Sequence, residues 1–261
     1  MKNEDIISNP PRFDYHEEAS APHPQVFDQI VRSRRSVRKF LAEPIPESIV
    51  REVLRWGLLA PTSSNLQCWE FHWVQDAGIK KQLDTAFMSQ PACTTAPTLL
   101  VAVARTKTWD RNRKGLLEIF NGQTPRPPRA LYVYYEKLVP LVYGLGPLGI
   151  LGPLKALLFW LVGWFRPVPR EPVSRAGLQQ WAVKTTALAC ENIMLGFSAH
   201  GYDTCPMEGF DSLRVRKILG LPRDAVVVMG ISAGRRAEGG IYGPRVRLPE
   251  DNFIKVIGAG N

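Results

Sequence analysis

The segment Thr98–Ala104, TLLVAVA, decides the fold class of this chain. Its seven residues carry no charge, and the six that follow Thr98 are all apolar. A strand covered by protein on both faces reads as a continuous apolar run, whereas a strand with one wet face alternates apolar and polar residues. We therefore expect a central strand that is buried between two layers.

Further strands and helices are predicted on both sides of this segment. CWEFHWV, residues 68–74, and AVVVMGIS, residues 225–232, have strand patterns. Residues 26–31, 48–60 and 174–200 show apolar side chains at helical spacing. Alternating helices and strands predict a layered α/β or α+β domain. The apolar stripe of the last helix comprises Val183, Ala187, Cys190, Met194 and Phe197.

Basic residues gather in two places that are far apart in the sequence. RRSVRKF, residues 34–40, has four cationic side chains in seven, and GPRVRLP, residues 243–249, supplies Arg245 and Arg247. In an extended stretch, residues two positions apart point to the same side. Guanidinium groups bind phosphate most strongly through paired hydrogen bonds. We expect the two clusters to converge on one phosphate group.

The composition limits the remaining possibilities. Lys and Arg number 33 and Asp and Glu 24, so the net charge is 33 − 24 = +9, which favours anionic partners. No helix-turn-helix, zinc-finger or aromatic RNA-binding motif accompanies the basic run, so we expect no nucleic acid partner.

The four cysteines and four histidines have no metal-ligand spacing, and no secretory signal is recognised, which predicts reduced thiols in a cytoplasmic protein. Residues 1–25, polar and rich in proline, predict an extended arm ahead of one domain, residues 26–261.

Residues 138–165, LVPLVYGLGPLGILGPLKALLFWLVGWF, break this pattern. They carry a single charge, on Lys155, and their longest proline-free apolar part is the 12-residue stretch 154–165, which includes that lysine. A membrane-spanning helix needs about 20 apolar residues. Three interpretations stay open: a transmembrane helix, a membrane-surface helix within residues 138–170, or burial inside the domain or a dimer.

Gly144, Gly146 and Gly149 in this segment form a GxGxxG pattern. A dinucleotide-binding fingerprint also requires a preceding strand, a following helix and an acidic residue about 20 positions further on. None of these is evident in the sequence, and Pro147 interrupts the pattern. We therefore do not interpret it as a nucleotide site.

Four sequence blocks together resemble the FMN-dependent nitroreductases, in particular the oxygen-insensitive bacterial kind. RRSVRKF resembles the phosphate-binding motif of that family, and APTSSNLQCW, residues 60–69, is similar to its serine and asparagine loop, PSSxNxQPW. PMEGFD, residues 206–211, resembles the block that faces the flavin ring, and PRVRLP, residues 244–249, resembles the C-terminal basic pair. The likeness extends over residues 27–104 and 178–257, so residues 105–177 form a divergent hydrophobic insertion.

Two departures from the family pattern are visible. Cys68 replaces the usual proline before Trp69, and Ser89 and Ala92 stand where the family commonly has an asparagine and a lysine near the flavin. The second departure concerns residues that would otherwise bind the pyrimidine edge of the ring.

The resemblance implies that FMN is the cofactor and assigns residues to its parts. The phosphate and ribityl chain would be held by Arg34, Arg35, Ser36, Arg38, Arg245 and Arg247. A second subunit would contribute Pro61, Thr62, Ser63, Asn65 and Gln67. Pro206, Glu208 and Gly209 would lie beside the ring, with the backbone N–H of Gly209 reaching flavin N5.

The resemblance also implies a fold, an assembly and a reaction. The fold would be α+β, a central and mostly antiparallel sheet flanked by helices, in an interlocked homodimer with two FMN sites. NAD(P)H would reduce the flavin, and a nitroaromatic, a quinone or another small apolar acceptor would then take a hydride from flavin N5. The flavin itself carries such chemistry, so no catalytic side chain or metal is expected. Residues 105–177 would shape the acceptor pocket.

Two alternatives to this function stay open. The first is a specialised flavin enzyme of the same fold, either a reductive dehalogenase or a biosynthetic dehydrogenase or oxidase. The second is a membrane-surface or anion-binding protein without catalysis. Its basic residues would dock on anionic lipid, and binding of that kind weakens with salt.

Overall fold

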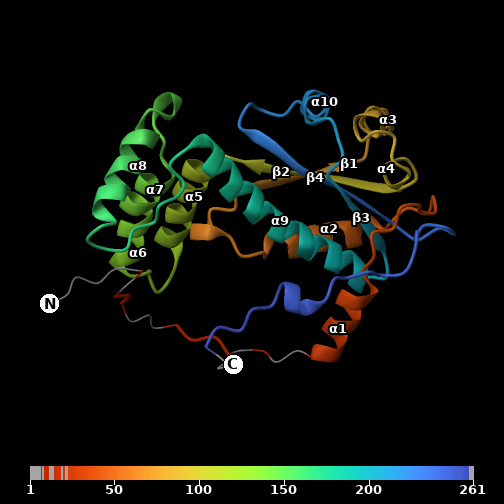
Figure 1. Cartoon of the computed structure of the whole chain (residues 1–261), viewed down its shortest axis with the longest axis horizontal. Helices are drawn as coiled ribbons and strands as arrows, with labels where there is room; N and C mark the ends of the chain where they lie inside the picture. Colours follow the sequence, from red (N-terminus) through yellow and green to blue (C-terminus); the bar gives the residue numbers. More distant parts are fainter. Residues whose placement is uncertain (1–6, 8, 12–14, 19, 21–22, 259–261) are drawn as a thin grey trace.

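A four-stranded sheet forms the centre of the molecule (Figure 1). The computed structural model describes residues 7, 9–11, 15–18, 20 and 23–258, so much of the predicted N-terminal arm lies outside the described residues. The strand order is β1–β2–β4–β3, and all three neighbouring pairs are antiparallel. This confirms the α+β class with an antiparallel sheet. The strands are β1 Trp69–Val74, β2 Thr98–Arg105, β3 Asp203–Met207 and β4 Ala225–Gly234.

Strand β2 is buried on both faces, as its apolar run predicts. Leu100 and Ala102 belong to the hydrophobic core on one side of the sheet, whereas Leu99 and Val101 belong to the core on the other side. β2 pairs with β1 at one edge and with β4 at the other, so it has no free edge. Successive side chains of a strand point to opposite faces, and here both faces meet protein.

Helices α2, Glu47–Leu58, and α9, Arg175–Ala199, cover one face of the sheet. Helix α9 begins where Ser174 accepts a hydrogen bond at Oγ from the backbone N–H of Gly177, 3.0 Å away. An N-terminal cap of this kind satisfies a backbone donor that the helix itself leaves free. The other face carries α3, Ala77–Ala86, α4, Pro91–Thr94, and α10, Ser212–Ile218.

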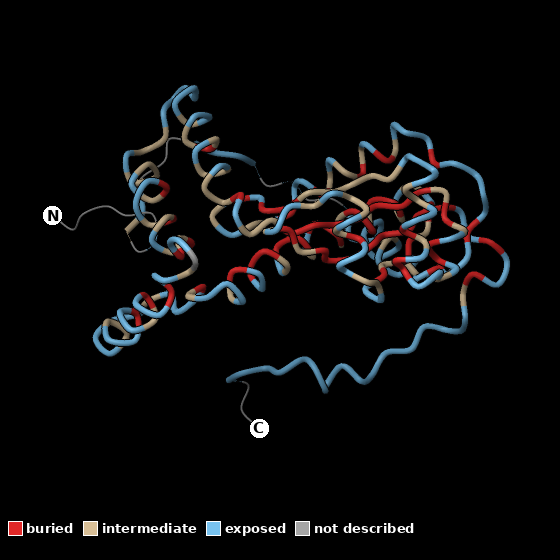
Figure 2. The backbone as a smooth tube through the Cα atoms, turned by 90° about the horizontal axis from the view of Figure 1, so that it is seen from above, coloured by how far each residue is buried: buried red, intermediate tan, exposed pale blue. Residues whose placement is uncertain are grey.

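The two ends of the described chain run along the β3 side of the sheet. After α1, Pro24–Ser33, residue Ser36 forms a parallel bridge to Thr204 of β3, and the N–H of Val37 donates to the carbonyl of Thr204 at 3.0 Å. Beyond β4 the chain continues as an extended tail, residues 241–258, interrupted only by the short helix η4, Glu250–Asn252. Figure 2 shows most of this tail as a pale-blue, exposed tube beside the body of the molecule.

The divergent middle segment forms a group of helices at one end of the sheet (Figure 1). Its first helix is α5, Trp109–Gly122. A nearly continuous helical stretch follows, made of α6, Arg129–Val133, the π-helical turn η2, Tyr134–Leu138, and α7, Val139–Tyr143. The segment ends with η3, Pro147–Gly149, and α8, Leu151–Val162. In the described part of the chain, no helix is both long and apolar enough to cross a membrane.

Candidate functional site

A cavity of about 230 Å³ lies between the two basic clusters. One wall comes from the segment that follows α1 and the other from the tail that follows β4. The structure therefore brings together two segments that are more than 200 residues apart in the sequence. All six residues that were expected to hold a phosphate line this cavity: Arg34, Arg35, Ser36, Arg38, Arg245 and Arg247.

The arginines themselves attach the tail to the segment after α1. Nη2 of Arg35 donates to the carbonyl of Gly243 at 2.6 Å. The guanidinium of Arg245 reaches back and donates to the carbonyls of Arg34 and, at 3.0 Å, of Arg32. Arg35 uses one N–H and Arg245 two on these backbone carbonyls, and both keep others, since a guanidinium has five N–H groups.

The cations that line this cavity lie close enough to repel one another. The pKa of Arg245 is lowered from its ordinary value, first by desolvation and then by the charges of Arg247, Arg35, Arg34 and Arg32. Two carboxylates approach the group from its α1 side: Nε of Arg32 lies 2.7 Å from Oδ1 of Asp28, and Nε of Arg34 lies 3.6 Å from Oε1 of Glu191. An anion placed among like-charged cations lowers the electrostatic energy of all of them.

The second predicted block, residues 61–67, is a loop with an uncommon backbone. It contains the short helix η1, Ser63–Asn65. Ser64, Asn65 and Gln67 have φ angles of 53°, 47° and 46°. These angles lie in the left-handed region, which costs a residue with a side chain about 1 kcal/mol or more. Such strain persists only where the surroundings impose it, and it is common at functional sites.

Three tyrosines of the middle segment impose this loop conformation. The hydroxyl of Tyr143 lies 2.8 Å from Oγ of Ser63 and 3.3 Å from Oγ of Ser64, and the hydroxyl of Tyr134 lies 2.7 Å from Oγ of Ser64. Tyr135 donates to the carbonyl of Ser64 at 3.0 Å. Burial, followed by the neighbouring tyrosines, raises the pKa of Tyr135 to about 12, so its hydroxyl stays a donor at neutral pH. We call Tyr134, Tyr135 and Tyr143 the tyrosine clasp.

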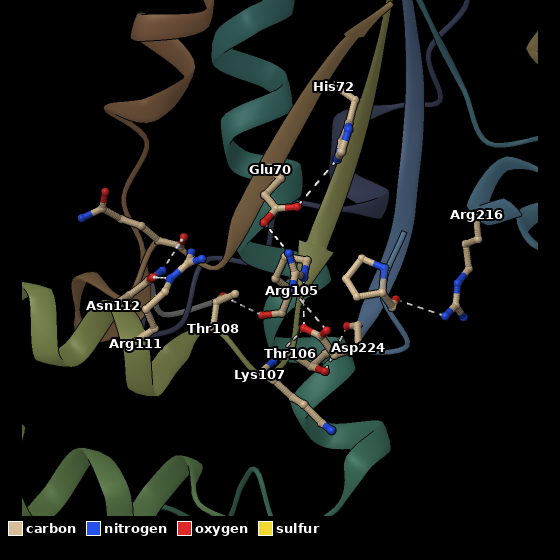
Figure 3. Close-up of polar contacts among 12 residues, drawn as sticks. Glu70, His72, Arg105, Thr106, Lys107, Thr108, Arg111, Asn112, Arg216 and Asp224 are labelled. Carbon is tan, nitrogen blue, oxygen red and sulfur yellow. Dashed lines mark hydrogen bonds and ion pairs between the residues drawn. The ribbon is translucent and has the colours of Figure 1, made fainter. Parts of the chain in front are cut away.

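The C-terminal half of the loop is held from α5. Nδ2 of Asn112 donates to the carbonyl of Leu66 at 2.7 Å and to that of Gln67 at 3.1 Å. Figure 3 shows Asn112 at this position, beside the end of β2. Neither the tyrosine clasp nor Asn112 was predicted, because no family motif was recognised from the sequence in residues 105–177.

An ion-pair network fixes the end of the sheet beside this loop (Figure 3). Arg105, the last residue of β2, pairs with Glu70 of β1 and with Asp224, where Nε and Oδ2 are 3.0 Å apart. Burial alone would raise the pKa of Asp224, but the hydrogen bonds and charge of Arg105 outweigh it, and this pKa lies below its ordinary value. The network ties together β1, β2 and the turn before β4.

The third block, residues 206–211, leaves the sheet at the end of β3. Pro206 belongs to β3, and Glu208 and Gly209 follow it as exposed residues. Nε2 of Gln90 donates to the carbonyl of Gly209 at 2.7 Å and to that of Phe87 at 3.0 Å. Gln90 was not singled out in the sequence, although it adjoins Ser89.

Glycine at position 209 is not required by the fold. A Cβ atom built on Gly209 would meet Nε2 of Gln90 at 3.5 Å, an ordinary van der Waals contact, and φ is outside the left-handed region. Space for a side chain therefore exists on the described chain. A requirement for glycine here has to come from a molecule that approaches the backbone closely.

The predicted residues fall into two groups that one copy of the chain does not bring together. The arginine cavity lies where the segment after α1 meets β3 and the tail, and none of residues 61–67 lines it. The loop lies at the other end of the sheet, beside α5 and α7 (Figure 1). The four cysteines are buried with free thiols, and burial raises the pKa of each, which excludes them as reactive thiolates.

Comparison with known proteins agrees with the fold. The model of the family described as "Nitroreductase family" matches residues 31–235. A relative named "NADH dehydrogenase", from Thermus thermophilus, is 30% identical over 228 residues, which cover 85% of this chain and 91% of the relative. The crystal structure of a nitroreductase-like protein from Streptococcus mutans has a TM-score of 0.69 at 18% identity and covers 90% of this chain and 100% of that one.

A further solved structure, from Exiguobacterium sibiricum and in complex with FMN, has a TM-score of 0.61 at 24% identity. It covers 91% of this chain and 99% of that one. These likenesses establish the fold, and the family model covers well over half of the sequence. The chain therefore belongs to the nitroreductase family.

Proposed function

We propose that this protein is an FMN-dependent oxidoreductase that takes electrons from NAD(P)H and passes them to a small aromatic acceptor. The observation that carries the proposal is the convergence of five arginines on one cavity from two distant segments. Family membership supports it, as do the name of the Thermus relative and the FMN in the Exiguobacterium structure.

The cavity fits the phosphate end of FMN. Its volume of about 230 Å³ is below the roughly 300–1,000 Å³ of complete ligand sites, so it can enclose the phosphate and the adjoining chain but not the ring system. The phosphate would be held by the guanidinium groups, and Ser36 would contact the ribityl chain. A dianion would relieve the repulsion from neighbouring arginines that, after desolvation, lowers the pKa of Arg245.

The ring system requires a second copy of the chain. Pro61, Thr62, Ser63, Asn65 and Gln67 would reach it from the partner, because within one copy they lie away from the arginine cavity. An apolar surface is available for such a dimer. Five tail residues, Val246, Leu248, Phe253, Ile254 and Val256, are between 61% and 74% exposed in the single chain.

FMN, when bound, accepts a hydride at N5 and passes two electrons to the next substrate. The chain has to fix the phosphate, hold the loop against the ring and leave one face open. The arginine cavity does the first, and the tyrosine clasp and Asn112 do the second. Glu208 and Gly209 are exposed beside β3, where Gly209 would permit close approach to the ring. Tyr134, which is half-buried, would give the acceptor site an aromatic side, which suits nitroaromatics and quinones.

Spectroscopy of the purified protein tests the proposal. We expect a yellow protein whose flavin spectrum is bleached by NADH or NADPH and restored by a nitroaromatic or a quinone. Halophenols in the same panel would reveal a dehalogenase, and rapid reoxidation by oxygen alone would reveal an oxidase. A colourless protein that takes up no added FMN would refute the cofactor and the reaction together.

Mixing two inactive variants tests the shared site. Arg35→Ala/Arg247→Ala damages the cavity, and Asn65→Ala/Gln67→Ala damages the loop, so each homodimer should bind FMN poorly. After subunit exchange, a heterodimer has one site built from two undamaged halves, and FMN binding should reappear. If mixing restores nothing although mass measurement shows heterodimers, the loop does not act across subunits.

A further inference from the structure

Helix α8 turns its charged side chain toward the protein and its apolar side chains outward, the reverse of a usual surface helix. Its one charged side chain, Lys155, is 6% exposed, and Nζ donates to the carbonyls of Val142 at 2.6 Å and Gly144 at 3.3 Å. Burial lowers the pKa of Lys155. The large apolar residues point away from the protein instead: Leu154, Leu157, Leu158 and Leu161 are between 48% and 64% exposed.

The outer face of α8 is apolar over its whole length. Gly152, Lys155 and Phe159 are buried and share one side of the helix. At about 100° per residue, Leu157 and Leu161 fall on the opposite side. A helix on a water-exposed surface normally carries its polar residues there. α8, at the outer edge of the helical end of the molecule, therefore presents a face that water does not favour (Figure 1).

Aromatic residues extend this face beyond the end of the helix. Trp160 and Trp164 pack edge to face with ring centroids 5.2 Å apart, and they are 51% and 71% exposed. Phe165, which follows, is exposed as well. Tryptophan is enriched where hydrocarbon meets lipid headgroups, because its ring is apolar and its N–H is polar.

Charge indicates what covers the face. Residues 138–170 contain no Asp or Glu, and the exposed Arg166 and Arg170 follow the helix. Arg170 packs against the C-terminal end of α8, where its Nη2 lies 2.5 Å from the position of a Cβ built on Gly163. A second copy of this segment would bring like charges together without an acidic partner. A surface of anionic lipid offers hydrocarbon for the apolar side chains and negative charge for the two arginines.

We propose that α8 is a membrane-surface anchor that lies flat in the headgroup region of a bilayer containing anionic lipid. Its 12 residues give a length of about 18 Å, against a hydrocarbon core of about 30 Å, so the helix lies in the plane of the surface. Leu154, Leu157, Leu161 and the two tryptophans enter the apolar layer, and Arg166 and Arg170 contact lipid phosphates. This inference is independent of the proposed redox function.

Flotation of the full-length protein with lipid vesicles tests the anchor. We expect it to float with vesicles of phosphatidylcholine that contain about a quarter phosphatidylglycerol, and less with phosphatidylcholine alone. Leu157→Gln/Leu161→Gln should weaken binding about a hundredfold, since each leucine loses the free energy of burying its side chain. Arg166→Gln/Arg170→Gln should remove most of the preference for the anionic vesicles. Leu213→Gln, on α10 and 75% exposed, is the matched control and should bind normally.

Two results would overturn the proposal. The first is that the folded original protein does not float with the anionic vesicles, or that Leu157→Gln/Leu161→Gln floats as well as the original protein does. The other is a loss of assembly mass in Leu157→Gln/Leu161→Gln, seen by analytical ultracentrifugation, with no vesicle binding by the original protein. That second result would assign the face to another copy of the chain. Circular dichroism of each variant confirms that it is folded.

Discussion

The hydroxyl of Tyr143 lies 2.8 Å from Oγ of Ser63. This contact joins residues 105–177, in which no motif was recognised although the family model spans them, to the loop of residues 61–67. Tyr134 and Tyr135 add two more hydrogen bonds to Ser64. The conformation of the loop of residues 61–67 therefore depends on side chains from residues 105–177. Substitutions in residues 105–177 can alter the loop without changing its own sequence.

Tyr143→Phe should loosen the loop while leaving the core intact. The ring keeps its packing on Trp181, with centroids 4.5 Å apart, and the loss is confined to the hydrogen bonds to Ser63 and Ser64, about 1 kcal/mol. Amide hydrogen exchange of the protein without FMN should become faster over residues 61–67. Tyr132→Phe is the control, because the Tyr132 hydroxyl is buried without a hydrogen-bond partner among the described residues. Equal exchange in the two variants would contradict the clasp.

Arg247→Ala should weaken FMN binding by about ten- to a hundredfold, the effect of removing a hydrogen bond to a charged group. Its guanidinium donates to the carbonyl of the adjacent Val246, so little else in the fold depends on it. Fluorescence titration of the protein stripped of flavin measures the dissociation constant. Arg223→Ala removes the same charge at a site away from the cavity and should bind FMN normally. Unchanged affinity in Arg247→Ala would remove this residue from the phosphate site.

Gly209→Ala should fold normally and turn over slowly. The described chain leaves room for the added methyl group, so the free energy of unfolding should change by no more than about 0.5 kcal/mol. A molecule that needs close approach to this backbone would be obstructed. Thermal unfolding and the rate of flavin reduction by NADH, measured by stopped flow, separate the two effects. Gly122→Ala, at the last residue of α5 with nothing near the added methyl group, should leave the reduction rate unchanged and raise the free energy of unfolding by no more than about 1 kcal/mol. Normal reduction in Gly209→Ala would argue against a ring beside this residue.

Asp224→Asn should reduce stability at neutral pH but not in acid. Asp224 has a lowered pKa in the folded protein, so its contribution is complete above the unfolded pKa of about 4 and is lost as the pH falls below it. We expect a deficit of about 1–3 kcal/mol in urea unfolding at pH 7, which shrinks below about pH 4. Asp251→Asn, in the exposed tail, should show no such deficit. A deficit that stays constant into acid would show that the Arg105 pair is not its source.

The elements with a strong local signal were predictable from the sequence. β2 was predicted as residues 98–104 and spans 98–105, and α9 was predicted as 174–200 and spans 175–199. The apolar stripe of α9 was only partly right, because Val183 and Ala187 are half-buried while Trp181 and Ile193 are buried. This helix packs against the sheet and against α2 at once, so more than one row of side chains is covered.

β3 was missed because it is short and contains Pro206. Proline is tolerated there since β3 lies at the edge of the sheet and pairs with β4 alone among the named strands. Such a strand is recognised only once its neighbour, here β4, is known, because its own sequence resembles a turn.

The convergence of the arginines was predictable, whereas the contacts that support the site were not. The two basic motifs predicted one shared anion site, and their arginines do line one cavity. Asn112 and Gln90 bind backbone carbonyls, and a carbonyl is present at every residue, so no pattern in the sequence marks the partner. The tyrosine clasp depends on the π-helical turn, which sets the rotation of Tyr134 relative to Tyr143. The outward face of α8 depends on Lys155 reaching carbonyls 11 and 13 residues before it.

The bond between Arg35 and Gly243 joins residues 208 positions apart, which affects how the protein matures. During synthesis the first basic motif emerges from the ribosome long before the second. Until the tail follows, the segment after α1 lacks the partner that closes the arginine cavity. If FMN binds as proposed, the site for its phosphate is complete only once the tail has been made, and a chain that stops before residue 243 would have all four strands of the sheet but would lack Arg245 and Arg247.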